Sequence, residues 1–137
     1  MNIAKFSEIF DGLRQAYGTF KIESKSSSGK TQGKATVVRG ERTTEHWEHH
    51  LSGQQSIGII PINENNECRW GCIDIDQYNF DHKALIDKIQ AAKLPLVVCR
   101  SKSGGAHVFL FTDAFIPAKD MQNVLTQLCA GLGYGGS

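Results

Sequence analysis

The sequence predicts an α+β fold in which a small N-terminal αβ module leads into an antiparallel sheet. Apolar residues recur at helical spacing near residues 3–17, 82–93 and 117–128. Short runs rich in Val, Ile and Phe lie between these segments and are bounded by Gly, Pro and Asn, as strands are. Two such runs flank a glycine-containing turn at residues 101–105, which predicts a hairpin and therefore antiparallel pairing.

Length and composition set the class of protein. The 137 residues are enough for one domain with a hydrophobic core, and 40% hydrophobic with 21% charged residues is typical of a soluble globular protein. Fifteen Lys and Arg against fourteen Asp and Glu give +1, so a charged surface must come from local clustering. Because the sequence contains no long apolar stretch, no signal peptide and no CxxC pair, we expect a cytoplasmic protein without a membrane partner.

Before the sheet we expect a helix, a short strand, a flexible loop, a second helix and an edge strand. These elements are predicted, in order, at residues 3–17, 20–22, 23–34, 43–51 and 57–62. Gly18 is expected to end the first helix, and Thr43 or Thr44 to cap the second. Pro61 lacks a backbone N–H, which places its strand at an edge.

The flexible loop at residues 23–34 reads ESKSSSGKTQGK. It contains no apolar residue and is rich in Ser, Gly and Lys, which is typical of a mobile loop. It includes Gly29-Lys30-Thr31, the end of a P-loop pattern, but Ser24 stands where that pattern requires its first glycine. We therefore interpret the segment as a solvated basic loop able to contact a phosphate backbone.

The sheet region is predicted to contain three strands and two helices. The strands are expected at residues 69–76, 96–99 and 107–111, and the helices at residues 81–93 and 117–128. The apolar faces of the two helices are predicted to carry Leu85, Ile86 and Ile89, and Met121, Val124, Leu125 and Leu128, respectively.

The first strand of this region contains two aspartates, Asp74 and Asp76, that alternate with isoleucines. Because strand side chains alternate between faces, the isoleucines can enter a core while the two carboxylates share the other face. Such a pair can bind one or two hard cations, and paired divalent metals stabilise phosphoryl transfer. The alternative is one acid that caps the next turn and one that is solvated, and for an isolated pair this is the commoner arrangement.

The turn between the last two strands is a candidate phosphate site. Backbone N–H groups of a glycine-containing turn form an anion-binding concavity, and nearby cations strengthen it. The residues concerned are Arg100, Ser101, Lys102, Ser103, Gly104, Gly105 and His107. The alternative is a plain hairpin turn with a surface lysine.

Histidines at 46, 49 and 50 fall on one side of the second helix. This spacing is compatible with zinc, but no cysteine or acid nearby completes a known ligand pattern. We favour a half-exposed polar helix face.

The order of these features resembles the archaeo-eukaryotic primase superfamily, and the local motifs are similar to the primase domain of TOTE conflict systems. The matching segments are WEHHLSG (47–53), IGIIPI (57–62), WGCIDIDQY (70–78), LPLVV (94–98) and RSKSGGAHVFLF (100–111). The resemblance covers about residues 45–134. It implies a single primase-like catalytic domain over residues 1–137, with an RRM-like antiparallel sheet.

The resemblance also implies roles for individual residues. Asp74 and Asp76 are expected to bind Mg2+ or Mn2+, and His107 to contact the triphosphate of the incoming nucleotide. In the resemblance, Ser101 matches the serine that begins the motif ending at this histidine. Gly105 stands at a position of the same motif where relatives often have serine. Relatives supply a third carboxylate from a later strand. The chain has no acid after position 120, so we expect the catalytic core to continue beyond position 137. We therefore expect the 137-residue form to fold but to incorporate no nucleotides.

The function that this resemblance implies is template-directed nucleotide transfer by a DNA primase or primase-polymerase. Its expected partners are nucleoside triphosphates, a single-stranded DNA template, and helicase or other replication domains, in a bacterial or phage-encoded protein. Two alternatives remain at this point. One is a non-catalytic RRM-like module that binds single strands on Phe109 and Phe111. The other is a metal-dependent nuclease.

Overall fold

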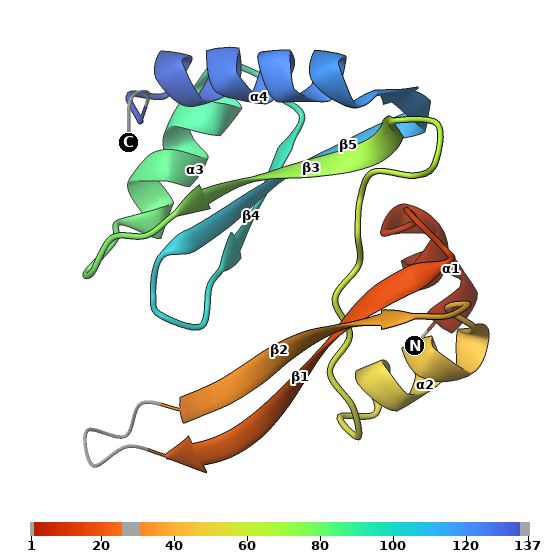
Figure 1. Ribbon diagram of the computed structural model, residues 1–137. Helices are drawn as coiled ribbons and strands as arrows, with labels where there is room; N and C mark the ends of the chain where they lie inside the picture. The colour runs from red at the N-terminus through yellow and green to blue at the C-terminus, as the bar shows by residue number, and fades with distance from the viewer. Residues whose placement is uncertain (1, 26–30, 135–137) are drawn as a thin grey trace. The chain divides into compact units, whose positions relative to one another are not determined.

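The computed structural model describes residues 2–25 and 31–134 of the chain. The described residues form four helices and five strands, and both sheets are antiparallel, so the predicted α+β class is confirmed (Figure 1). The chain forms two compact units, Met1–Asn65 and Asn66–Ser137, here called the N-terminal and C-terminal units. No helix in the described part of the chain is long and apolar enough to cross a membrane.

The N-terminal unit is a hairpin with two short helices. Its elements are α1 (Ile3–Ile9), β1 (Ala16–Lys25), β2 (Thr31–Arg39) and α2 (Thr44–Leu51). Strands β1 and β2 pair from Ala16↔Arg39 to Lys25↔Thr31, with one irregularity between Ile22 and Ser24. Thr43 precedes α2 as predicted, and its backbone N–H donates to Nδ1 of His46 at 2.9 Å.

The interior of the N-terminal unit is partly polar. The α1 and α2 helices meet where the Phe6 and Trp47 rings lie edge to face, 5.5 Å between centroids. Beside them, Arg42 donates to Oδ1 of Asp11 at 3.0 Å, although the Arg42 side chain is only 5% exposed. Its guanidinium also lies 5.7 Å from the centre of the Trp47 ring. An ion pair and one indole ring therefore occupy the centre of this unit.

Three predictions for the N-terminal unit are wrong. The first helix ends at Ile9, not near residue 17, because the chain turns to let the Leu13 N–H donate to the Ile60 carbonyl at 2.8 Å. Both ends of the loop expected at 23–34 belong to the hairpin, because residues 23–25 lie in β1 and residues 31–34 lie in β2. Residues 26–30 of this predicted loop lie outside the described residues. The strand expected at 57–62 is a single bridge between Gly58 and Gly18.

Backbone hydrogen bonding explains the second error. A strand ladder needs only paired N–H and C=O groups, so polar residues can continue a hairpin begun by their neighbours. Sequence periodicity detects side-chain burial and does not detect such a ladder.

The C-terminal unit is a three-stranded sheet with two helices. Its elements are β3 (Glu67–Ile75), α3 (His82–Ala91), β4 (Leu96–Arg100), β5 (Ala106–Pro117) and α4 (Ala118–Gly131). The strand order is β3-β5-β4, and both pairs are antiparallel. This β-α-β-β-α order gives the first five elements of the β-α-β-β-α-β arrangement, in agreement with the predicted RRM-like sheet.

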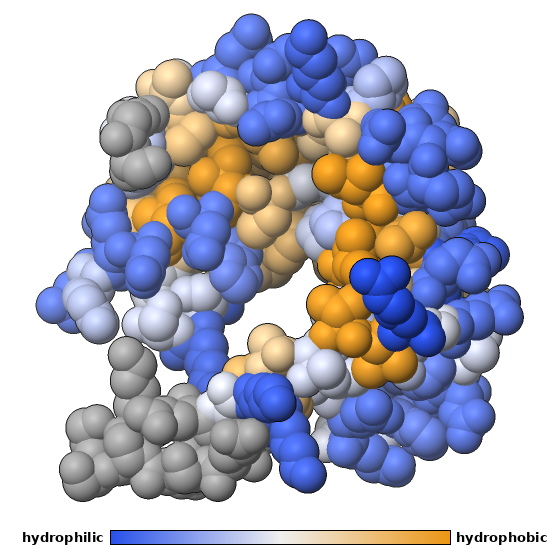
Figure 2. Space-filling view, in the orientation of Figure 1, coloured by the Kyte–Doolittle hydropathy of each residue, from blue (hydrophilic) through white to orange (hydrophobic). Residues whose placement is uncertain are grey.

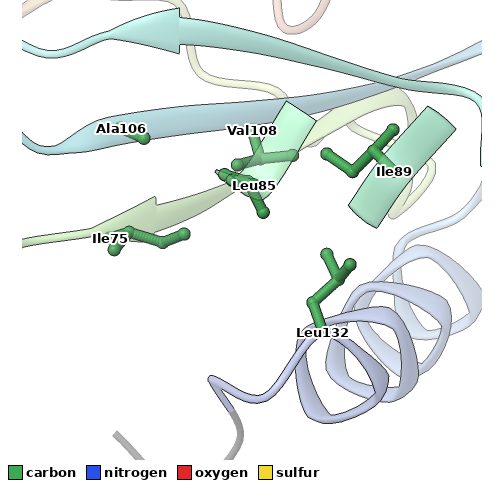
Figure 3. Close-up of a cluster of buried hydrophobic side chains, with 6 residues drawn as sticks. All are labelled: Ile75, Leu85, Ile89, Ala106, Val108 and Leu132. Atoms are coloured by element: carbon green, nitrogen blue, oxygen red, sulfur yellow. The ribbon is translucent and has the colours of Figure 1, made fainter. Parts of the chain in front are cut away.

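The helices α3 and α4 cover one face of this sheet (Figure 1). In the main core cluster, side chains from β3, β5, α3 and the end of α4 point toward one another (Figure 3). Leu85 and Val108 in this cluster are fully buried. A second cluster contains Cys68, Leu110 and Met121. The outer side of α4 is mostly hydrophilic (Figure 2). Ile86 and Val124, which we expected on the buried helix faces, are 37% and 42% exposed.

Candidate nucleotide and metal site

The paired acids lie at the end of β3. Asp74 is the penultimate residue of the strand, and Asp76 is the first residue after it. Ile75 between them is 5% exposed and belongs to the core, whereas both aspartates are exposed. The predicted alternation is therefore present, with isoleucine directed into the core and carboxylates accessible to solvent.

His107 lies directly opposite Asp74 in the β3–β5 ladder. Its Nε2 is 3.5 Å from Oδ1 of Asp74, an ion pair when the imidazole is protonated. The two side chains are 43% and 71% exposed, so the pair is open to a ligand. Phe109 and Phe111 follow on the same face, and their rings stack 5.8 Å apart. The structure thus brings together two candidate residues that are 33 positions apart in the sequence.

The candidate phosphate turn joins β4 to β5. The Ser101 N–H donates to the Gly105 carbonyl at 3.0 Å, and the Gly104 N–H donates to the Ser101 carbonyl at 3.1 Å. These two N–H groups close the turn and are not free to bind an anion. Among the residues that the structure describes, the N–H groups of Lys102 and Ser103 have no such partner and remain available.

Two glycines give this turn its shape. Gly104 has φ of +93°, in the left-handed region that favours glycine. A Cβ on Gly105 would lie 2.1 Å from the Ile75 carbonyl oxygen, so no larger residue fits without movement of the backbone. The turn is therefore pressed against the end of β3, where the two aspartates lie. This contact explains why position 105 of this chain is glycine.

Side-chain groups surround the turn. Arg100 and Lys102 are exposed, and the Ser101 and Ser103 hydroxyl oxygens lie 3.3 Å apart. The turn therefore presents two cations and two hydroxyl groups in addition to backbone N–H groups.

His82, at the start of α3, was not recognised in the sequence analysis. Its Nε2 donates to the Gly105 carbonyl at 2.8 Å, and its ring packs edge to face on Phe80 at 5.1 Å. It ties α3 to the candidate phosphate turn, 23 positions away in the sequence. No motif marks it, because the contact depends on the tertiary packing of α3 against the sheet.

Cys72 lies on the same sheet face, two residues before Asp74. Burial, with the negative charge of Asp74 as the next cause, raises the pKa of its thiol to about 11. The thiol therefore stays protonated at neutral pH, and a protonated thiol is not a metal ligand.

The donor chemistry of the two aspartates fits Mg2+ or Mn2+. Mg2+ is commonly bound by one or two carboxylates together with substrate phosphates, and it keeps several waters. Asp74 and Asp76 could supply the carboxylates of such a site, and the turn at residues 101–105 lies beside them. Within residues 2–25 and 31–134, no group of three or more His, Cys, Asp or Glu side chains is arranged to hold a metal.

The three histidines of α2 have separate partners. His46 Nε2 lies 3.1 Å from the Tyr17 hydroxyl, His49 Nε2 lies 3.8 Å from a Glu45 oxygen, and His50 Nδ1 lies 3.2 Å from the Gln55 carbonyl. Their side chains serve local packing and hydrogen bonding within the N-terminal unit.

The fold and site together define an α+β domain with a β-α-β-β-α sheet unit and an acid–histidine pair beside a glycine turn. The family model described as "TOTE conflict system, Archaeo-Eukaryotic Primase domain" matches residues 14–133. The chain therefore belongs to this family of primase-like nucleotidyltransferases. The match extends over parts of both compact units. A comparison with curated proteins found no match.

Proposed function

We propose that the chain provides the nucleotide- and metal-binding centre of a template-directed nucleotidyltransferase, a DNA primase or primase-polymerase. The observation that carries this proposal is the placement of Asp74 beside His107, next to the turn at residues 101–105, in a member of this primase family.

The turn would bind the triphosphate of an incoming nucleotide. The N–H groups of Lys102 and Ser103 donate to phosphate oxygens, and Lys102 and Arg100 bring positive charge. In the ladder His107 lies between Asp74 of β3 and Cys99 of β4, two residues after the turn, so its imidazole would reach the same phosphates. These groups favour the charge that develops on a leaving pyrophosphate.

Asp74 and Asp76 would hold Mg2+ or Mn2+. A bound divalent ion of this kind lowers the barrier to phosphoryl transfer by neutralising charge on the reacting oxygens. The carboxylates remain accessible, and in the absence of a ligand the Asp74 carboxylate is balanced by His107 when that ring is protonated. The proposed protein partners are helicase or other replication domains, in the cytoplasm of a bacterium or of a cell infected by a phage.

Template-dependent incorporation of a labelled nucleotide tests this proposal in the protein that carries this domain. Asp74→Asn and Asp76→Asn are each expected to abolish incorporation in Mn2+ and to leave the melting temperature unchanged or higher. Asp87→Asn is the matched control, because Asp87 is an exposed aspartate on α3 that pairs only with Lys83 among the described side chains.

Three outcomes distinguish the candidate functions. Incorporation that depends on Asp74 and Asp76 supports nucleotide transfer. Template binding without incorporation supports the non-catalytic module, and degradation of the template supports the nuclease. Unfolding of the aspartate variants would assign these acids a structural role.

A further inference from the structure

The hairpin of the N-terminal unit concentrates positive charge. Its two strands, Ala16–Lys25 and Thr31–Arg39, contain four basic residues and one acidic residue, while the whole chain carries only +1. Charge clustered in this way on an almost neutral protein indicates a local anionic partner.

Two of these lysines face each other. Lys21 and Lys34 are directly paired in the β1–β2 register, so their side chains project from the same face of the hairpin. Both are exposed, and no carboxylate that the structure describes forms an ion pair with either. Like charges directly opposite each other in an antiparallel pair are destabilising. The pair therefore opposes hairpin stability, and a bound anion would remove this cost.

A hollow lies beside Lys21 of this pair. Its volume is about 670 Å³, and it lies where β1 passes the end of α2. Its lining includes Lys21, His50, Gln54 and Gln55. The hollow therefore offers side-chain amide and imidazole groups next to an ammonium group.

The wall of this hollow is fixed to β1. The Ser56 hydroxyl accepts from the Phe20 N–H and donates to the Phe20 carbonyl, both at 2.7 Å. His50 is held by the bond of its Nδ1 to the Gln55 carbonyl. The hollow is therefore formed before a ligand arrives, which lowers the entropic cost of binding.

We propose that this face of the hairpin, Lys21 and Lys34 with the adjoining hollow, binds single-stranded nucleic acid. The lysines contact successive phosphates, and the hollow receives an unstacked base. A single strand fits better than a duplex because its bases are free to leave the stack and to use their hydrogen-bonding edges. The inference rests on the proposed function in naming nucleic acid as the polyanion, and it assigns the strand to residues distant in sequence from the Asp74–His107 pair.

Affinity for a fluorescent single-stranded oligo(dT) of about 20 nucleotides, measured over a range of salt concentrations, tests the proposal. The Lys21→Gln/Lys34→Gln double variant is expected to bind about tenfold more weakly at moderate salt, with a salt slope smaller by about 1.4, because two phosphate contacts are lost. Lys5→Gln/Lys119→Gln is the charge-matched control, because it removes two exposed lysines outside the hairpin. Lys21→Arg/Lys34→Arg should retain affinity. Thermal melting of each variant verifies folding, and the double glutamine variant should melt at the same or a higher temperature.

Two further probes test the details. An oligonucleotide of the same length with abasic sites should bind more weakly than oligo(dT), and equal affinity would contradict the base-binding role of the hollow. If the double variant binds duplex DNA more weakly but binds the single strand as the wild type does, the single-strand assignment is contradicted. Wild-type affinity and salt slope in the double variant would overturn the whole inference. The nucleotide-transfer proposal would be unaffected by that result, because it depends on the Asp74 and Asp76 variants.

Discussion

The two units of this chain are stabilised in different ways. The C-terminal unit buries aliphatic side chains between a sheet and two helices, and Leu85 and Val108 are completely inaccessible there. The N-terminal unit has a buried guanidinium, that of Arg42, paired with Asp11 and packed near Trp47. An apolar core tolerates changes of pH, whereas a buried ion pair depends on the ionisation of its members. The comparison therefore predicts different responses of the two units to the same perturbations.

The largest expected effect is in the apolar core. Leu85→Ala should cost the C-terminal unit about 4 kcal/mol of unfolding free energy, because a fully buried leucine leaves a cavity. Ile86→Ala is the matched control on the same helix, since Ile86 is 37% exposed and should lose much less. Urea unfolding followed by the fluorescence of Trp70, which lies on β3, measures both in a Trp47→Phe background, because the chain contains two tryptophans. Equal losses for the two variants would contradict the assigned core.

The buried ion pair should give the next largest effect. Arg42→Ala should cost the N-terminal unit about 3 kcal/mol, because the carboxylate of Asp11 is left buried without this partner. Arg14→Ala removes the other arginine that pairs with Asp11, but the Arg14 side chain is 69% exposed, so the loss should stay below about 1 kcal/mol. Unfolding followed by Trp47 fluorescence in a Trp70→Phe background compares the two variants. Similar losses would show that burial does not decide the strength of these pairs.

The same acid should make the N-terminal unit sensitive to low pH. Burial by itself raises the pKa of Asp11, but hydrogen bonds from Arg14, the Gly12 N–H and Arg42 outweigh it and hold the pKa below its ordinary value. Because the pKa of Asp11 is lower in the folded state, its carboxylate stabilises the folded unit fully at pH values above the unfolded-state pKa of about 4. This contribution is lost as the pH falls through the folded-state pKa. The midpoint of Trp47-monitored unfolding should therefore decrease below pH 4, and Asp11→Asn should flatten this dependence.

A smaller effect is expected at His82. Loss of its hydrogen bond to the Gly105 carbonyl in His82→Ala should cost about 1 kcal/mol. If His82 positions the phosphate turn, the same variant should also weaken nucleotide binding, and His82→Gln, which keeps a donor, should restore part of the affinity. Lower stability with unchanged nucleotide affinity would limit His82 to a structural role.

The difference between the units also explains which parts of the structure were predictable from the sequence. Helices α3 and α4 and strands β3 to β5 bury repeated apolar side chains, so the apolar periodicity predicted all of these elements. The alternation along β5 also predicted the sheet face on which His107 lies. The hairpin β1–β2 continues by backbone pairing through the polar residues 23–25 and 31–34, which leave no apolar pattern to read. The partners of Arg42 and His82 depend on tertiary contacts between distant residues, and residue types alone do not specify them.

A titration of the chain with a fluorescent nucleoside triphosphate in the presence of Mn2+ tests the central claim most directly. The account predicts saturable binding that is abolished by EDTA, and about tenfold weaker binding in Lys102→Ala and in His107→Ala, because each loses a charge-assisted contact to phosphate. Lys119→Ala, which removes an exposed lysine on α4, should bind as the wild type does, and affinity for a template strand should change little in all variants. Wild-type nucleotide affinity in both turn variants, or equal losses for nucleotide and template, would contradict the assignment of this turn to the triphosphate.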